Sequence, residues 1–293
     1  MPAAQGLLRK TSVFLEMIKF SHSVFALPFA LLAMLVAAGG WPGPATVALI
    51  LVAVVGARTA AMCFNRIADR DVDAENPRTA NRALVTGELD TRFAWVALAV
   101  SLAVFYVAAG LLNPLCLLLA TPCMAVLLGY SWMKRVTDYS HFVLGAALGL
   151  APIGAWVAVR GELAWFPALL GLAVTLWVAG FDVLYSCQDY DYDREAEGLH
   201  SIPKRLGLAG AMAFARRLHG VALLAFVGVW ALGMPMLGAL TLAGVAVVGV
   251  LLIYQHSLVS PSDLSRIDAA FFTTNGMISL GLFLIVWADV ALG

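Results

Sequence analysis

Residues 93–111 read FAWVALAVSLAVFYVAAGL, a run that contains no charged side chain. A helix needs about 20 such residues to cross the roughly 30 Å hydrocarbon layer of a membrane. Because backbone polar groups in lipid must pair within the spanning structure, and because the run lacks the alternation of a barrel strand, a helix is predicted. Asn113 and Pro114 end the run, and a second apolar run follows at 114–131. This stretch therefore predicts two transmembrane helices joined by a short turn.

Apolar runs of similar length recur along the whole chain. The predicted spanning segments are about 23–39, 46–64, 93–111, 114–131, 142–159, 163–187, 217–234, 237–255 and 270–289. Breaks between them carry glycine and proline, which end helices. We therefore expect an all-α polytopic membrane protein with nine transmembrane helices.

The composition supports this class of protein. The chain has 293 residues, of which 62% are hydrophobic and 12% are charged, whereas a soluble domain has about 25% charged residues. A soluble globular enzyme, a disordered region and a disulfide scaffold are thereby excluded. The net charge of zero gives no field that would attract nucleic acid, and no feature indicates an obligate protein partner. The expected partner is the lipid bilayer.

The basic residues indicate the orientation in the membrane. If the N-terminus is cytoplasmic, nine crossings place 17 of the 18 Lys and Arg residues on the cytoplasmic side, with Arg160 on the other. Cytoplasmic loops carry an excess of Lys and Arg. We therefore expect a cytoplasmic N-terminus and an outside C-terminus.

Two of the predicted cytoplasmic loops are long and acidic, and they follow the second and the sixth predicted helix. A spacing of four helices suggests an internal repeat. We expect residues 1–293 to form one domain of two four-helix halves, about 14–139 and 140–256, with a ninth helix at about 270–289.

The carboxylates of these two loops recur at helical spacing. Asn65, Asp69 and Asp73 lie at i, i+4 and i+8, and Asp189 and Asp193 lie at i and i+4. If the helices continue past the membrane surface, each set shares one helix face. Like charges at this spacing repel, so two such sets on one side of a membrane indicate a bound cation. Carboxylate and amide oxygens suit Mg²⁺ or Ca²⁺ and not Zn²⁺. Of these, Mg²⁺ usually bridges one or two carboxylates to phosphate oxygens.

Basic residues interleaved with these carboxylates would contact phosphate directly. They are Arg66, Arg70, Arg78, Arg82, Lys204 and Arg205. The two loops together therefore predict a clamp for a magnesium-bound diphosphate.

The motifs resemble those of the UbiA superfamily of intramembrane prenyltransferases. The residues that match the first family motif, N-x-x-x-D-x-x-x-D followed by R-T-x-x-R, are Asn65, Asp69, Asp73, Arg78, Thr79 and Arg82. The second family motif, D-x-x-x-D, matches Asp189 and Asp193, and the aspartate that usually precedes it in the helix resembles Asp182. A further stretch resembles the 4-hydroxybenzoate branch of the family, and its residues are Tyr130, Met133, Lys134 and Arg135.

The resemblance implies nine helices around a central cavity and transfer of a polyprenyl group from its diphosphate to an aromatic acid. The implied Mg²⁺ ligands are Asn65, Asp69, Asp73, Asp189 and Asp193. The residues expected to contact substrate are Asn65, Arg78, Arg82, Lys134, Arg135 and Asp182. Among these, Arg135 is expected to bind the acceptor's carboxylate.

Two further roles remain open in the sequence. A carboxylate such as Asp191 or Asp71 is expected to accept the ring proton. Aromatic side chains facing the allyl cation could come from Phe25, Trp132, Trp177 or Tyr185.

The implied pathway is ubiquinone or menaquinone biosynthesis at a bacterial cytoplasmic (inner) membrane, with the active site on the cytoplasmic side. Three alternatives remain: a naphthoate acceptor as in the futalosine route to menaquinone, a haem acceptor, and a membrane cation transporter. A transporter needs ionisable residues at mid-membrane. Because the sequence offers Asp182 as its only clear intramembrane acid, the transporter is the least favoured of the three.

Overall fold

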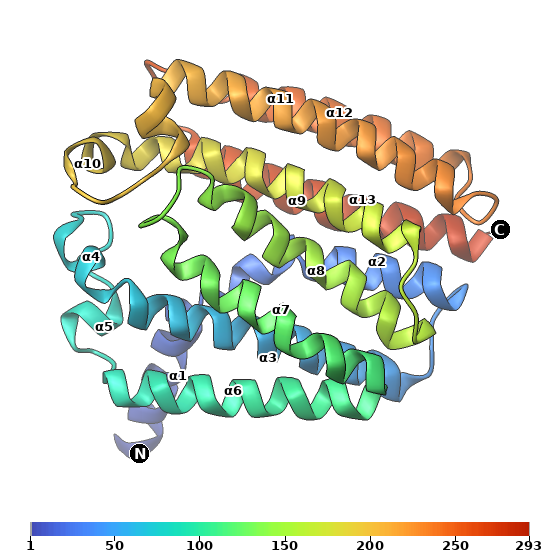
Figure 1. Ribbon diagram of the computed structural model, residues 1–293, viewed down its shortest axis with the longest axis horizontal. Helices are drawn as coiled ribbons and strands as arrows, with labels where there is room; N and C mark the ends of the chain where they lie inside the picture. The colour runs from blue at the N-terminus through green and yellow to red at the C-terminus, as the bar shows by residue number, and fades with distance from the viewer. Residues whose placement is uncertain (1, 293) are drawn as a thin grey trace.

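The structure is a computed structural model that describes residues 2–292, with the side chains of residues 2–8 and 20–22 outside the description. Across residues 2–292 the chain is helical and forms no β-sheet (Figure 1). The helices of the first part are α1 (Pro2–Met17), η1 (Phe20–Phe25), α2 (Leu27–Ala38), α3 (Pro44–Ala68), α4 (Arg70–Glu75), α5 (Ala83–Thr86), α6 (Thr91–Leu112) and α7 (Pro114–Met133). Those of the second part are α8 (Ser140–Arg160), α9 (Trp165–Ser186), η2 (Cys187–Asp189), α10 (Tyr190–Glu195), α11 (Ile202–Gly233), α12 (Ala239–Ser257), η3 (Ala269–Thr273) and α13 (Thr274–Leu292).

The predicted all-α membrane class is confirmed. Within residues 2–292, 8 helical segments are long and apolar enough to cross a membrane. The first predicted segment, 23–39, is helical but shorter, since the apolar helix there covers Ser23–Ala38. The count of nine crossings and the side on which each terminus lies stay predictions.

One predicted boundary differs clearly from the structure. α11 begins at Ile202, well before the predicted start at 217. Ser201 caps its N-terminus by accepting a hydrogen bond from the backbone N–H of Lys204 at 3.3 Å, a preferred arrangement at helix starts. Gly207 then adopts a left-handed backbone, φ 68°, and bends the helix where a residue with a side chain would be strained. The segment before the kink is thus helical although it is too polar to be predicted as a span.

α9 lies at the centre of the bundle, between α8 and α11 (Figure 1). Trp177 of α9 is fully buried and packs on Phe29 of α2 with ring centroids 5.2 Å apart, and Phe29 stacks on Phe226 of α11 at 5.9 Å. The largest hydrophobic cluster draws residues from α2, α8, α9, α11, α12 and α13, and so from both predicted halves. The division into two halves with a ninth helix stays a prediction.

Glycines set the close approach of α8 to α9. A Cβ added at Gly145 would clash with the backbone of Thr175, and one at Gly149 would clash with Gly171. Small residues let helix backbones approach closely in membranes. This contact fixes how the first turn of α8 meets the last turns of α9.

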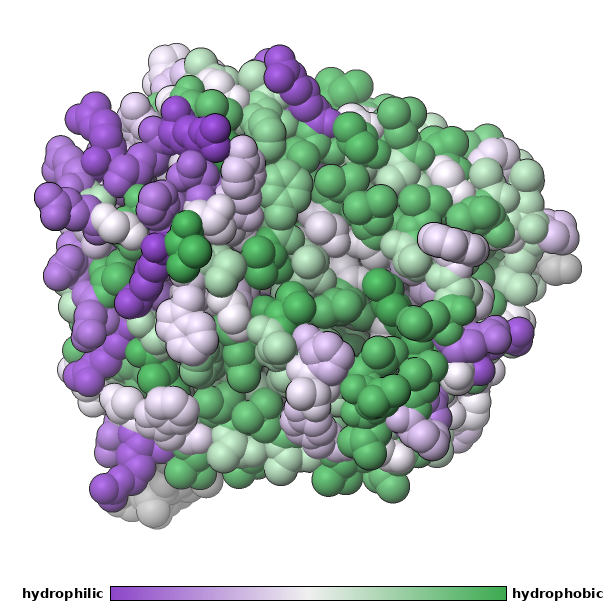
Figure 2. Space-filling model, viewed as in Figure 1, coloured by the Kyte–Doolittle hydropathy of each residue, from purple (hydrophilic) through white to green (hydrophobic). Residues whose placement is uncertain are grey.

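The short helices α4, α5 and α10 all lie at one end of the bundle (Figure 1). Hydrophilic residues gather at the same end, whereas hydrophobic residues cover most of the middle of the visible face (Figure 2). The two acidic loops are therefore neighbours in space at one end of an apolar bundle.

Candidate active site

The first acidic loop keeps its helical register past the end of α3. The backbone N–H of Asp69 donates to Asn65 at 2.9 Å, and that of Asp73 donates to Asp69 at 2.7 Å. The helix axis changes at Asp69, where α3 ends and α4 begins. The i, i+4, i+8 spacing thus places the three side chains on one face, as predicted.

The second loop repeats this arrangement through η2 and α10. Asp189 ends η2, and Asp193 lies one turn further along α10. Both are buried, with exposed fractions of 6% and 3%. Burial of a charged side chain is rare unless it is paired, so each carboxylate requires partners.

Both faces line one polar cavity of about 260 Å³. The residues of its lining that the sequence predicted for the site are Asn65, Asp69, Asp73, Arg78, Arg82, Lys134, Arg135, Asp182, Asp189 and Asp193. The structure therefore brings ten of the eleven predicted site residues together.

Asp191 does not line this cavity. It lies between Asp189 and Asp193 on α10 and is exposed, because adjacent helical residues point in different directions. Asp71 is exposed for the same reason. The prediction that one of these two accepts the ring proton is not supported by their positions.

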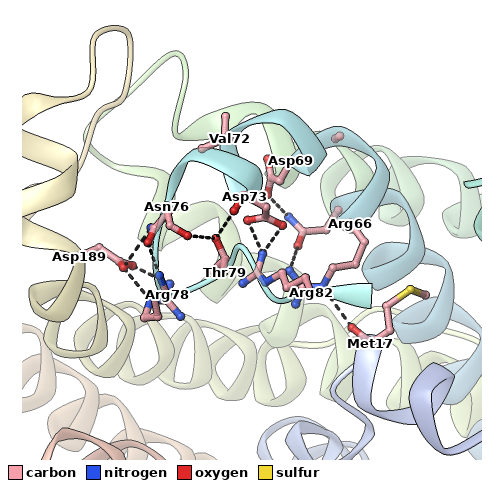
Figure 3. Close-up of polar contacts among 12 residues, drawn as sticks. Met17, Arg66, Asp69, Val72, Asp73, Asn76, Arg78, Thr79, Arg82 and Asp189 are labelled. Atoms are coloured by element: carbon pink, nitrogen blue, oxygen red, sulfur yellow. Dashed lines mark hydrogen bonds and ion pairs between the residues drawn. The ribbon is translucent and has the colours of Figure 1, made fainter. Parts of the chain in front are cut away.

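An ion pair joins the two loops (Figure 3). The Nε and Nη2 atoms of Arg78 donate to the two carboxylate oxygens of Asp189 at 2.7 and 2.8 Å. Asn76 also donates to Asp189, at 3.4 Å. A fork of this kind fixes orientation as well as charge, so the first loop holds a carboxylate of the second in place.

A second ion pair lies within the first loop. Nη1 of Arg82 donates to Asp73 at 2.5 Å, and Thr79 donates from its hydroxyl to the backbone carbonyl of Asp73 at 3.0 Å. The R-T-x-x-R motif thus folds back onto the end of α4 (Figure 3). Arg78, Thr79 and Arg82 each have a defined contact there.

Asp69 is held mainly by a neutral group, whereas Asp73 and Asp189 each bind an arginine at short distance. Asn65 donates from its side-chain amide to Asp69 at 2.7 Å, while the amide oxygen of Asn65 accepts from Arg66 at 3.2 Å. The guanidinium of Arg135 lies 3.7 Å from Asp69. Burial, with the neighbouring charge of Asp73, raises the pKa of Asp69 above its usual value. Asn65 therefore positions Asp69, and its own oxygen is directed to Arg66 and not to the cavity carboxylates.

These residues fit a magnesium-bound diphosphate better than an ion held by protein alone. Among the described residues, no group of three or more His, Cys, Asp or Glu side chains is close enough to hold a metal. Mg²⁺ in enzymes is usually held by one or two carboxylates plus substrate phosphates. Oδ2 of Asp193 is buried without a hydrogen-bond partner among the described residues, so an acceptor oxygen is available to a cation.

Arg58 was missed as a site residue by the sequence interpretation. It lines the polar cavity and also the adjoining apolar cavity. Its Nη2 donates to the carbonyl of Lys19 at 2.9 Å, and its buried Nε has no hydrogen-bond partner among the described residues. A charged residue within an otherwise apolar run is itself a signal of function, and Arg58 carried that signal.

The adjoining cavity is apolar and larger, about 470 Å³. It lies between α3, α6, α7 and α8. The residues that line both this cavity and the polar one are Arg58, Met62, Asn65, Tyr130, Leu144 and Leu148. The two cavities therefore adjoin, so that a charged cavity lies next to a hydrocarbon one.

The four aromatic candidates separate into two groups. Phe25 and Tyr185 line the polar cavity, and the guanidinium of Arg78 lies 5.9 Å from the ring centre of Tyr185. Trp177 packs in the core, and Trp132 is 47% exposed and packs on Phe64. Only the first two are placed to face a bound substrate.

The helical bundle and its acid-lined cavity define an integral membrane protein built to hold an anionic group beside an apolar chain. The model of the UbiA prenyltransferase family matches residues 26–277. The chain belongs to this family and is a prenyltransferase.

Individual relatives agree with this assignment. The chain is 32% identical over 253 residues to a 4-hydroxybenzoate octaprenyltransferase of Alkalilimnicola ehrlichii, with 85% of each chain covered. The apo structure of a UbiA homolog from Aeropyrum pernix superposes with a TM-score of 0.79 at 36% identity, covering 92% of this chain and 97% of that one. A UbiA homolog from Archaeoglobus fulgidus, solved with DMAPP and Mg²⁺, has a TM-score of 0.71 at 20% identity, covers 96% and 99% of the two chains, and shares the fold.

Proposed function

We propose that the protein transfers a polyprenyl group from a polyprenyl diphosphate to an aromatic acid of the 4-hydroxybenzoate type. The observation that carries this proposal is the fork between Arg78 and Asp189. It joins both acidic loops over a polar cavity that adjoins an apolar one. Such a space accepts one molecule with a charged head and a hydrocarbon tail.

The diphosphate head binds at the polar end. Arg78, Arg82 and Lys134 supply positive charge there, and cations placed in advance stabilise charge that develops on a leaving group. Mg²⁺ held by Asp69, Asp73, Asp189 and Asp193 would supply Lewis-acid stabilisation of the leaving diphosphate. The structure of the Archaeoglobus fulgidus homolog, which shares the fold, was solved with DMAPP and Mg²⁺ bound, and this supports the choice of metal.

The prenyl tail occupies the apolar cavity. Its walls come from α3, α6, α7 and α8 and include Ala109, Cys123 and Ala151. Water would quench an allyl cation, and an apolar enclosure prevents this side reaction. The hydrocarbon end of the cavity therefore serves both to bind the tail and to keep the reacting carbon dry.

The acceptor ring binds where the two cavities meet. Arg58 lies at this junction with an unpaired buried Nε, so the structure favours Arg58 as the partner of the acceptor's carboxylate. Arg135, the sequence-based candidate, donates to the carbonyl of Ala68 at 2.6 Å and lies beside Asp69. It lines the cavity as well and remains the second candidate.

The name of the Alkalilimnicola relative supports 4-hydroxybenzoate as the acceptor. The setting that we propose is ubiquinone or menaquinone biosynthesis at a bacterial cytoplasmic membrane, with the cavity facing the cytoplasm. A naphthoate or haem acceptor remains an alternative within the family. A cation transporter is disfavoured, since the acidic loops carry matched arginines and close over a cavity that suits an anion.

A competition assay tests the acceptor. Purified protein in proteoliposomes receives Mg²⁺, a polyprenyl diphosphate, and equal amounts of 4-hydroxybenzoate and a dihydroxynaphthoate. We expect the prenylated benzoate to be the main product. Preferential prenylation of the naphthoate would assign the protein to the other branch, and cation flux without prenyl transfer would support the transporter.

A further inference from the structure

One cavity carboxylate has no place in the diphosphate clamp. Asp182 of α9 lines the polar cavity and lies two turns before Asp189. At 1.5 Å of rise per residue, it is about 10 Å deeper in the bundle. Whereas Asp73 and Asp189 each contact an arginine, the ion pair of Asp182 among the described residues is with His141, whose Nδ1 lies 2.7 Å from Oδ2.

His141 is completely buried, with an exposed fraction of 0%. A carboxylate only accepts hydrogen bonds, so Nδ1 of His141 carries the proton and donates it to Asp182. Nε2 is buried without a hydrogen-bond partner among the described residues. The imidazole therefore holds the carboxylate from behind and does not itself reach the cavity.

The position of this pair is set by a close contact between two helices. Gly145 and Gly149 bring α8 against α9, and His141 lies one turn before Gly145. On the cavity side, Tyr130 of α7 lines the polar cavity together with Asp182. Tyr130 also lines the apolar cavity, so the polar cavity that contains Asp182 adjoins the apolar one there.

We propose that Asp182 accepts the ring proton of the aromatic acceptor and that His141 is its positioning residue. This inference rests on the proposed function. It fills the role for which the exposed Asp71 and Asp191 are unsuited.

The reaction balances with these groups. The allylic C–O bond breaks, and the diphosphate leaves with the electron pair. The ring carbon ortho to the phenol forms the new C–C bond with the allylic carbon. The C–H electrons at that carbon restore aromaticity, and the proton passes to the carboxylate oxygen of Asp182 that is not bonded to His141. A carboxylate bound to a metal cation would be a poorer base, so Asp182 suits this role better than the four clamp aspartates.

A ring-deuterated acceptor tests the assignment. With 4-hydroxybenzoate deuterated ortho to the phenol, we expect wild-type turnover to show little isotope effect, because cleavage of the C–O bond is slower than proton loss. Asp182→Asn is expected to lower kcat by about 10²–10⁴-fold and to reveal a normal primary isotope effect. His141→Phe is expected to reveal the same isotope effect with a smaller loss of kcat. His141→Asn, whose amide N–H replaces Nδ1–H, should restore most of the rate.

The pair of the exposed His200 and the half-buried Asp138, 3.3 Å apart and outside the cavity, gives the matched control. Asp138→Asn should leave both kcat and the isotope effect unchanged. Binding of the polyprenyl diphosphate to each variant reports whether the fold is intact.

The outcomes separate this inference from the proposed function. Suppose that the wild type transfers the prenyl group. If Asp182→Asn and His141→Phe then both keep an unchanged kcat, or both have a lower kcat without an isotope effect, the proton-acceptor role alone is overturned. Absence of transfer to any aromatic acid by the wild type would overturn the proposed function and this inference with it.

Discussion

The two acidic loops have the same D-x-x-x-D spacing but differ in how their carboxylates are held. In the first loop, Asp73 is held by Arg82 of the same loop. In the second loop, Asp189 is held by Arg78, which is supplied by the first loop. The nearby Arg194 of the second loop instead lies over the ring of Tyr190.

This difference shows that the loops are not equivalent halves of a symmetric site. The first loop contains an arginine that pairs with its own carboxylate, Arg82, and another that pairs with a carboxylate of the second loop, Arg78. In the second loop, Asp189 depends on Arg78 of the first loop, and a carboxylate oxygen of Asp193 is buried without a partner among the described residues. The first loop therefore organises the site, and the second supplies open acceptor oxygens to it.

The largest expected effect comes from removing a clamp carboxylate. Asp73→Asn and Asp189→Asn should each lower kcat by about 10³-fold or more, since each removes charge stabilisation of the leaving group. Prenyl transfer by purified protein measures this loss. Glu195→Gln, an exposed substitution in the second loop, is the control and should behave like the wild type. Near-normal turnover of either aspartate variant would show that its loop is dispensable.

The next effect concerns the link between the loops. Arg78→Gln leaves the buried Asp189 without its fork, and a hydrogen bond to a charged group contributes about 1.5–3 kcal/mol. We expect a fall of roughly 10²-fold in kcat/KM for the polyprenyl diphosphate. Arg194→Gln serves as the matched control and should have little effect. If both arginine variants behaved alike, the asymmetry between the loops would have no functional meaning.

A smaller effect separates Arg58 from Arg135. A hydrogen bond to a charged group contributes about 1.5–3 kcal/mol. Arg58→Gln is therefore expected to raise KM for the aromatic acid by roughly 10- to 100-fold, with a lesser change in KM for the diphosphate. Steady-state kinetics on Arg58→Gln and Arg135→Gln test this assignment. A selective rise in the acceptor's KM in Arg135→Gln alone would restore the sequence-based assignment.

The smallest effect is a pH dependence of magnesium binding. Because burial and the charge of Asp73 raise the pKa of Asp69, a falling pH protonates Asp69 earlier than an ordinary aspartate and removes a ligand. Apparent Mg²⁺ affinity should thus weaken as pH falls through this raised pKa, by up to about tenfold per pH unit for one proton. Isothermal titration of Mg²⁺ at several pH values measures the change. An affinity that stays constant down to the ordinary pKa of aspartate, about 3.9, would contradict it.

The sequence predicted features that depend on local spacing. The apolar runs predicted the helices, and the i, i+4 spacing predicted that Asn65, Asp69 and Asp73 share a face. Local hydrogen bonds and burial decide both features, so neither requires knowledge of distant residues.

Contacts between distant helices were not predictable in the same way. Arg78 and Asp189 are separated by 111 residues, and Asp182 meets His141 through the packing of α8 on α9. Arg58 appears in the sequence as one charge in an apolar run, and only the fold places it at the junction of two cavities. Asp191 lies within the motif but is exposed and does not line the polar cavity, so its role stays a prediction.

In the proposed function, both loops hold one diphosphate group together. A double-mutant cycle of Asp73→Asn and Asp189→Asn, read out by Mg²⁺-dependent binding of an unreactive polyprenyl diphosphate analogue, tests it most directly. The two losses should be strongly non-additive, because the second substitution removes little once the shared site is broken. Two independent, additive losses of binding free energy would show that each loop binds on its own and would contradict a shared diphosphate site.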